Sequence, residues 1–438
     1  RRRADAPSRA ARMIGRSSMT VGRETRARGT TAFRHRNYRV FFVGQAVSLV
    51  GTWMQQVAQA WLVLELTGDP IWLGIVAAAQ FIPVMILGLF AGVAADALPK
   101  RQTLVATQAA MMSLAIVLAA LTISGVVQVW MILVLAILLG CANAVDMPVR
   151  QAFAIELVGR EDVGNAVALN SAMFNGSRIV GPALAGLTIA AFGVGTAFVV
   201  NALSFLAVIV ALLMLDVTTL RTPPRIARPT TAGQVIENLA EGLRYVRHTP
   251  LVLLAVLVVG GVGTFGMNFS VLIPAFAADD LASGAAGYGF LMAASGVGSL
   301  IAALALAFRG KPHSSRIATG AIILGIASVA MAALSSYASA VILMVLIGYG
   351  GISMAATANA TIQLAVPDDL RGRVMSVYTT IFASSAPVGG LLMGAIASGF
   401  GPAVAIGVGG VLSGFVGVAA ALWLRAQRQA AMSVPAIA

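Results

Sequence analysis

The sequence predicts an all-α membrane protein with twelve transmembrane helices in two pseudo-symmetric six-helix bundles. Of its 438 residues, 59% are hydrophobic and only 10% are charged, whereas a soluble domain carries about 25% charged residues. The apolar residues come in runs of about 18 or more, which is long enough to cross a bilayer. The short loops between these runs alternate between loops with Lys or Arg and loops with neither. We therefore expect the lipid bilayer to be the main partner of this chain.

Each apolar run defines one predicted span. The spans cover residues 38–66, 71–97, 103–123, 128–148, 165–192, 195–215, 250–278, 285–308, 316–335, 338–364, 373–399 and 402–424. Loops after even-numbered spans contain basic residues such as Lys100, Arg150 and Arg371, and loops after odd-numbered spans contain none. Because cytoplasmic loops are enriched in Lys and Arg, we expect both termini in the cytoplasm.

The polar segments divide the chain into domains. Residues 1–37 form a basic cytoplasmic tail without the apolar core of a signal peptide. The N-terminal bundle covers 38–215 and the C-terminal bundle covers 250–424. Between them, 216–249 is a cytoplasmic linker whose end, QVIENLAEGLRYVRHTP, is typical of an amphipathic surface helix. Residues 425–438 form a second cytoplasmic tail.

The two halves of the sequence resemble each other. The stretch GDPIWLGIVAA from Gly68 is similar to GAAGYGFLMAA from Gly284, and each opens the second span of its half. Weak similarity between two six-helix halves is typical of parallel repeats in secondary transporters. Glycines four residues apart, such as Gly88 and Gly92, favour close helix packing. Packing within one chain accounts for them, so we expect a monomer, with oligomerisation as the alternative.

Several classes of function are excluded by missing motifs. Lys100 and Lys311 are not followed by Ser or Thr, so there is no Walker A loop for ATP. No serine has glycine at both −2 and +2, and the three histidines lack zinc-ligand spacing. We expect no enzyme activity, no cofactor and no metal. The basic residues lie mainly in tails and loops, which argues against a nucleic-acid partner. Either an ion gradient, for which we expect protons, or the substrate's own gradient would then drive transport.

A loop motif between the second and third spans indicates a family. The stretch GVAADALPKR resembles the G-x-x-x-D-R-x-G-R-R motif of the major facilitator superfamily. Four residues match it, and Ala97 and Pro99 depart from it. The resemblance implies that the matching residues form a conformational latch between the two halves: Gly92, Asp96, Lys100 and Arg101.

The fifth span carries a second motif, SRIVGPALAG. It resembles the antiporter motif of superfamily exporters at Gly181, Pro182 and Gly186. Pro182 is expected to kink the helix, and the glycines allow close packing. A purely structural kink is the alternative.

Further stretches are similar to one branch of the superfamily. DMPVRQAF (146–153), GNAVALNSAMFN (164–175) and RGRVMSVY (371–378) resemble the branch that contains the enterobactin exporter. The resemblance implies a bacterial inner-membrane exporter with a rocker-switch mechanism. Its substrate would be a small amphipathic molecule, siderophore-like or drug-like. An importer, or a membrane sensor or scaffold, remains an alternative.

Arg178 is the most informative single residue. It lies about 13 residues into the fifth span, hence about 20 Å from its cytoplasmic end. A charge at that depth costs at least about 2.5–3.5 kcal/mol, and no carboxylate is expected at matching depth. Arg178 therefore faces a water-filled cavity, where it contacts either an anionic substrate or polar groups that hold the helices together.

Other polar residues inside the spans predict the walls of this cavity. Gln45, Ser48, Thr52, Gln55 and Gln59 share one face of the first span because they are spaced three or four apart. In lipid such a stripe must face protein or water. The predicted cavity residues are Thr52, Gln55, Gln59, Asn170, Asn175, Arg178, Asn268 and Thr357. Each could instead bond a neighbouring helix. Glu65 and Asp146 are weak candidates for proton coupling.

Overall fold

The computed structural model describes residues 30–221, 232–308, 313–334 and 336–433. Parts of the expected tails at 1–37 and 425–438, and of the linker at 216–249, lie outside these residues. Within the described part the chain is helical throughout, without a strand. The fold class predicted from the sequence is confirmed.

The N-terminal bundle is built from five long helices that make six crossings. They are α2 (Arg36–Thr67), α3 (Pro70–Ala97), α4 (Lys100–Ile123), α5 (Val129–Phe192) and α6 (Val194–Leu213), with the short 3-10 helices η1 (Thr31–Arg34) and η2 (Val217–Thr219) at either end. Hydropathy alone identifies 10 spans among the described helices. It counts α5 once, and it misses α2 because polar residues line that helix.

One boundary in this bundle was wrong. The sequence predicts a loop between 148 and 165, but the chain is helical on both sides of a kink at Gly159, the one residue of α5 with non-helical backbone angles (φ 76°). Glycine adopts that conformation without the steric cost that a side chain brings. The chain therefore reverses direction at one residue, and residues on both sides of it are helical.

The C-terminal bundle follows an amphipathic helix. The helices are α7 (Ala232–His248), α8 (Pro250–Gly266), α9 (Phe269–Ala275), the π-helix η3 (Phe276–Asp280), α10 (Gly284–Phe308), α11 (Ser315–Ala333), α12 (Tyr337–Ala365), α13 (Asp368–Phe400) and α14 (Pro402–Ser433). α7 packs on α13, where Arg373 forms an ion pair with Glu241 (2.6 Å).

The seventh span is interrupted, whereas the sequence predicts one helix over 250–278. The break falls at Met267 and Asn268, between α8 and α9. The Asn268 side-chain amide donates to the carbonyl oxygen of Thr264 (2.7 Å). That carbonyl would otherwise accept the backbone N–H of residue 268, so the side chain competes with the helix for its own hydrogen bond.

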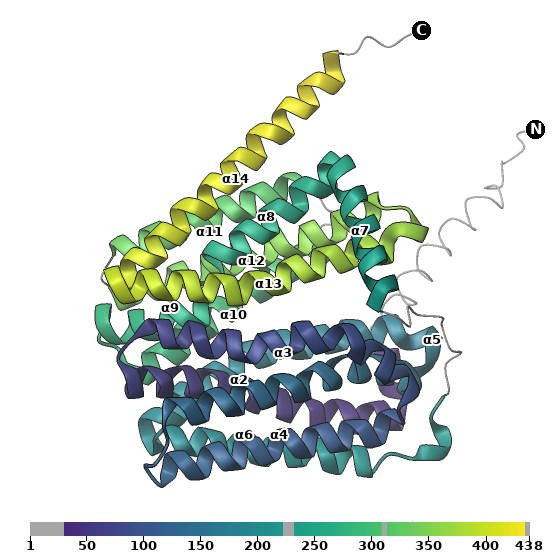
Figure 1. The fold of residues 1–438 in the computed structure, drawn as a ribbon, viewed down its shortest axis with the longest axis vertical. Helices are drawn as coiled ribbons and strands as arrows, with labels where there is room; N and C mark the ends of the chain where they lie inside the picture. The colour runs from purple at the N-terminus through teal and green to yellow at the C-terminus, as the bar shows by residue number, and fades with distance from the viewer. Residues whose placement is uncertain (1–29, 222–231, 309–312, 335, 434–438) are drawn as a thin grey trace, which may run out of the picture.

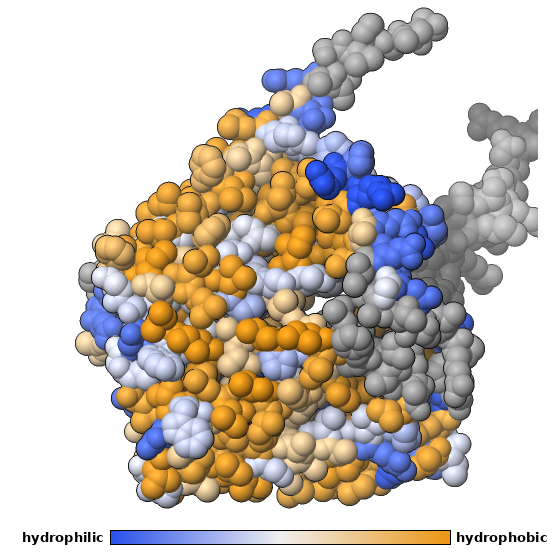
Figure 2. All heavy atoms as spheres, in the orientation of Figure 1, coloured by the Kyte–Doolittle hydropathy of each residue, from blue (hydrophilic) through white to orange (hydrophobic). Residues whose placement is uncertain are grey.

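The two bundles meet along two helix pairs, α5 with α10 and α3 with α13 (Figure 1). Large apolar side chains are exposed on the outer faces, for example Leu203 (62%) and Ile326 (65%). Figure 2 shows apolar residues spread over most of the visible face, as expected of a surface that lies in lipid. The chain is a multi-pass membrane protein.

The two ends of the bundles differ in charge. We call the end with α7 and the α3–α4 turn the basic end, because Lys100, Arg101, Arg247 and Arg371 lie there. The opposite end carries the turns at Gly68, Gly125, Gly193 and Gly401, where the described residues include no Lys or Arg. At the basic end His35 pairs with Asp162 (2.8 Å), which fixes the start of α2 and lowers the pKa of Asp162.

Candidate substrate-binding site

A cavity of about 1220 Å³ lies between the two bundles. This is slightly more than the range of typical ligand pockets, about 300–1,000 Å³. α2, α3 and α5 supply most of its wall, and α9, α10 and α13 contribute the other side. Its lining reaches Leu239 on α7 at the basic end and Tyr288 near the opposite end.

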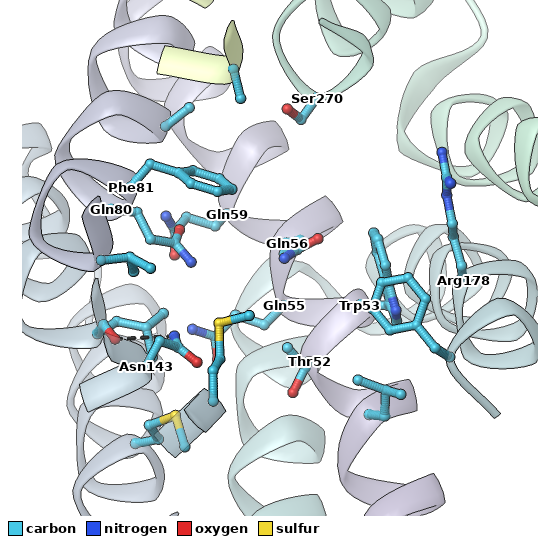
Figure 3. Close-up of a pocket in the computed structure, with 18 of the residues that line it drawn as sticks. Thr52, Trp53, Gln55, Gln56, Gln59, Gln80, Phe81, Asn143, Arg178 and Ser270 are labelled. Atoms are coloured by element: carbon cyan, nitrogen blue, oxygen red, sulfur yellow. Dashed lines mark hydrogen bonds between the residues drawn. The ribbon is translucent and has the colours of Figure 1, made fainter. Parts of the chain in front are cut away.

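The polar stripe of α2 forms one wall of the cavity. The residues that the spacing places on one face all line it: Gln45, Ser48, Thr52, Gln55 and Gln59. Figure 3 shows Gln55, Gln56 and Gln59 of this helix, with Gln80 of α3 beside Gln59. Gln55 accepts a hydrogen bond from the Asn201 amide, which ties it to α6. The remaining wall is largely apolar, with methionines that can adapt to different ligand shapes: Met85, Met111, Met147, Met173, Met267 and Met292.

Arg178 lies in the second half of α5 and lines the cavity. It is about 28 Å along the helix from Gly159 and about 21 Å from Phe192. Its guanidinium carbon lies 5.9 Å from the centre of the Trp53 ring, a cation–π contact. Among the described residues no carboxylate lines the cavity or pairs with Arg178. No carboxylate of the described residues therefore compensates its charge.

A second charged group lies in the first half of α5. The Asp146 side chain is fully buried and forms an ion pair with Arg150, one helical turn further on. Asp146 also accepts from the Thr107 hydroxyl (2.7 Å) and the Gln108 amide (2.9 Å), both on α4. Arg150 lines the cavity. The sequence prediction placed Arg150 in a loop, and this was wrong because α5 continues to Gly159.

The cavity is sealed at the opposite end by close contacts between the bundles. A Cβ atom at Gly289 of α10 would overlap the carbonyl oxygen of Pro182 and lie 2.8 Å from Gly186 Cα. In the other pair of helices, a Cβ atom at Gly74 would overlap the Gly390 carbonyl. Figure 1 shows α9 between the two bundles at this end.

Aromatic residues add to this seal. Trp61 of α2 stacks on Tyr288 of α10, with ring centres 6.3 Å apart. The Trp61 indole N–H donates to Glu65 (2.6 Å). Glu65 therefore lies beside the seal and outside the cavity lining, whereas the cavity extends toward the basic end.

Comparison with known proteins identifies the family. The profile of the transmembrane secretion effector family matches residues 27–435. The chain belongs to this family. Its members are transporters of the major facilitator superfamily, so the chain is a membrane transporter of small molecules and not an enzyme.

Relatives and solved structures agree with this family. The chain is 30% identical to the multidrug efflux pump Tap of Mycolicibacterium fortuitum, over 79% of this chain and 85% of that protein. It is 26% identical to the staphyloferrin A transporter of Staphylococcus aureus, over 83% and 90%. The nucleoside transporter NupG has the same fold, with a TM-score of 0.67, 12% identity and coverage of 90% of this chain and 99% of that chain.

Of the four residues of the predicted latch motif, the structure describes the side-chain contacts of Lys100 and Arg101. Lys100 pairs with Glu156 of α5 (2.8 Å), and Arg101 donates to the Leu212 carbonyl at the end of α6 (2.7 Å). These contacts join helices of the N-terminal bundle. The Asp96 side chain and the surroundings of Gly92 lie outside what the structure describes, so the role of these two residues as a latch stays a prediction.

The helix-kink motif lies at the helix contacts of α5. Gly181 packs against Trp53 and Val50 of α2, and Pro182 and Gly186 pack against α10. α5 keeps helical angles at Pro182.

Three residues expected in the cavity are not part of its lining. Asn175 donates to the Ser171 carbonyl of its own helix (2.8 Å), and Asn268 bonds Thr264 at the helix break. Thr357 is fully buried within the C-terminal bundle. The Thr357 hydroxyl has no hydrogen-bond partner among the described residues. A lone polar residue can bond its own helix backbone or be buried inside a bundle, so it does not by itself predict a cavity. Asn170 does line the cavity and accepts from the Tyr38 hydroxyl (3.1 Å).

Proposed function

We propose that the protein is a secondary active exporter of small amphipathic molecules, siderophore-like or drug-like. The observation that carries the proposal is the large, mainly apolar cavity between two bundles, which reaches one end and is sealed at the other. Such a cavity suits a molecule with an apolar body and a few polar groups. The relatives named as a multidrug efflux pump and a staphyloferrin A transporter support both substrate classes.

Alternating access would follow from motion of one bundle against the other. Parallel six-helix repeats typically rock around a site at their interface. In this chain the glycine contacts of α5–α10 and α3–α13 would separate at the opposite end, while the basic end closes. The substrate would then leave on the side opposite to its entry.

Proton coupling is part of the proposal, and two carboxylates are candidates. Asp146 is buried, and its partner Arg150 lines the cavity. Protonation of Asp146 would free Arg150 and change the charge of the cavity wall. Glu65 is exposed, but its bond to Trp61 places it beside the seal. We favour Asp146 because its only ion-pair partner in the described chain is a cavity residue.

The orientation in the membrane gives the first prediction. Since basic loops stay in the cytoplasm, the basic end and both termini should be cytoplasmic. Reporter fusions after residue 433 and at Ser336, in the α11–α12 turn, should give opposite signals. Identical signals from the two fusions would contradict the proposed orientation.

Export itself can be measured in everted membrane vesicles. Vesicles that contain the protein should accumulate members of a panel of amphipathic compounds when a pH gradient is imposed, and collapse of the gradient should stop this accumulation. Vesicles without the protein are the control. Accumulation by right-side-out vesicles alone would make the protein an importer, and the lack of movement of any compound in either preparation would favour a sensor or scaffold.

A further inference from the structure

We infer that Arg178, resting on Trp53, is the anion-binding subsite of the cavity and selects substrates that carry a carboxylate. This inference rests on the proposed function, because it names the substrate class of the same cavity. Three features of the described residues support it: the charge of the lining, the geometry of the guanidinium, and the place of Arg178 between the bundles.

The first feature is the charge of the side chains that line the cavity. Two arginines line the cavity and no described carboxylate does. Arg150 is compensated by Asp146, so Arg178 supplies the only unbalanced charge among the described lining residues. A neutral side chain would be more stable at this depth, and an unpaired intramembrane charge is by default a functional group. The cavity should therefore attract anions and repel cations.

The geometry suits a carboxylate. Trp53 is held by Phe174, with ring centres 5.5 Å apart, and Arg178 lies over the Trp53 ring. A cation–π contact keeps the guanidinium over the ring and leaves its N–H groups available for a planar, bidentate acceptor. Figure 3 shows Arg178 extending from α5 beyond Trp53, away from the α2 glutamines. The Trp53 indole N–H is also buried without an acceptor. Trp53 and Arg178 therefore offer donors that no described side chain is shown to accept.

The position of Arg178 links binding to the transport cycle. Its backbone contacts α10, where a Cβ atom at Gly296 would lie 3.0 Å from the Arg178 carbonyl oxygen. The subsite thus lies at the α5–α10 contact between the bundles. The apolar body of the ligand would lie against methionines of the lining, such as Met173 of α5 and Met292 of α10. The expected substrate is an amphipathic monoanion.

Matched probes can test the inference on purified protein. The pair is 1-pyrenebutyrate and its neutral primary amide, which differ only in the acidic group. The wild type should bind the acid about tenfold or more tightly than the amide, since hydrogen bonds to charged groups are the strong ones. Arg178→Gln should remove this preference and leave amide binding unchanged. Arg178→Lys should keep part of the preference for the acid, because lysine retains the positive charge but lacks the planar guanidinium that can donate to both carboxylate oxygens.

The control is Arg425→Gln, which removes an exposed arginine of α14 far from the cavity lining. It should bind both probes like the wild type. Equal binding of acid and amide by the wild type would overturn the inference. A purely structural role of Arg178 would also overturn the inference. In that case Arg178→Gln should lose much of its thermal stability and bind the acid and the amide equally more weakly.

The two proposals can fail separately. If the acid preference depends on Arg178 but everted vesicles accumulate neither probe nor any compound of the panel, export is refuted and the anion subsite stands. If vesicles accumulate acid and amide equally in wild type and Arg178→Gln, the subsite is refuted and export stands.

Discussion

Gly289→Leu is expected to reduce transport at least about tenfold while the protein still inserts into the membrane. Gly289 lies against the Pro182 carbonyl and Gly186, and no side chain fits between α10 and α5 there. Overpacking costs about 1–3 kcal/mol, enough to shift a two-state equilibrium about 5- to 150-fold. The state in which the opposite end is closed would lose population, and the cycle would stall. Transport in everted vesicles, normalised to the amount of protein, measures the effect.

The matched control for this change is Gly399→Leu. Gly399 is near the opposite end of α13, is exposed, and has open space around its Cα. The added leucine should face lipid and leave transport within about twofold of the wild type, since surface substitutions change stability by about 0.5 kcal/mol or less. Normal transport by Gly289→Leu would show that the contact between α5 and α10 is not a gate.

Asp146→Ala is expected to lower the free energy of unfolding by about 3–5 kcal/mol, the usual effect of removing one partner of a buried ion pair. Arg150 would lose its carboxylate, and Thr107 and Gln108 of α4 would lose their acceptor. Asp146→Asn keeps an acceptor in place and should fold better, but it cannot carry a proton. Its transport should no longer respond to a pH gradient. Thermal unfolding in detergent and vesicle transport measure the two effects.

Asp368→Ala provides the comparison. Asp368 also pairs with an arginine one turn away, Arg371, but its side chain is 88% exposed, whereas that of Asp146 is 0% exposed. Surface ion pairs contribute about 0–1 kcal/mol. Its removal should change neither stability nor coupling appreciably. A stable Asp146→Asn protein with an unchanged response to pH would exclude Asp146 as the coupling residue.

Most of the fold could be predicted because lipid imposes simple rules on a sequence. Apolar length and loop charge were sufficient to find the spans, including α2, whose polar stripe hides it from hydropathy alone. The two errors have local causes. The turn at Gly159 is made by a single residue with positive φ. The residues on both sides of it are helical, so there is no loop segment that the sequence could have indicated. The helix breaks at Asn268 because its side-chain amide donates to the Thr264 carbonyl oxygen. The periodicity of apolar residues gives no sign of this hydrogen bond.

The candidate site could also be predicted from the sequence in part. A stripe of polar residues at helical spacing identifies a cavity wall because all its members must avoid lipid together, and this worked for α2. Single residues such as Asn268 and Thr357 carry no such constraint. Arg150 was missed, although its spacing of four from Asp146 is that of an ion pair within a helix. The contact of Arg178 with Trp53 joins two helices and needs the structure.

Directional export can be measured by comparing two vesicle preparations from the same cells. Initial rates of uptake of one amphipathic compound are measured in everted and in right-side-out vesicles, each with and without a protonophore. We expect concentrative uptake in everted vesicles only, and its loss when the protonophore collapses the pH gradient. Concentrative uptake in right-side-out vesicles only would contradict directional export.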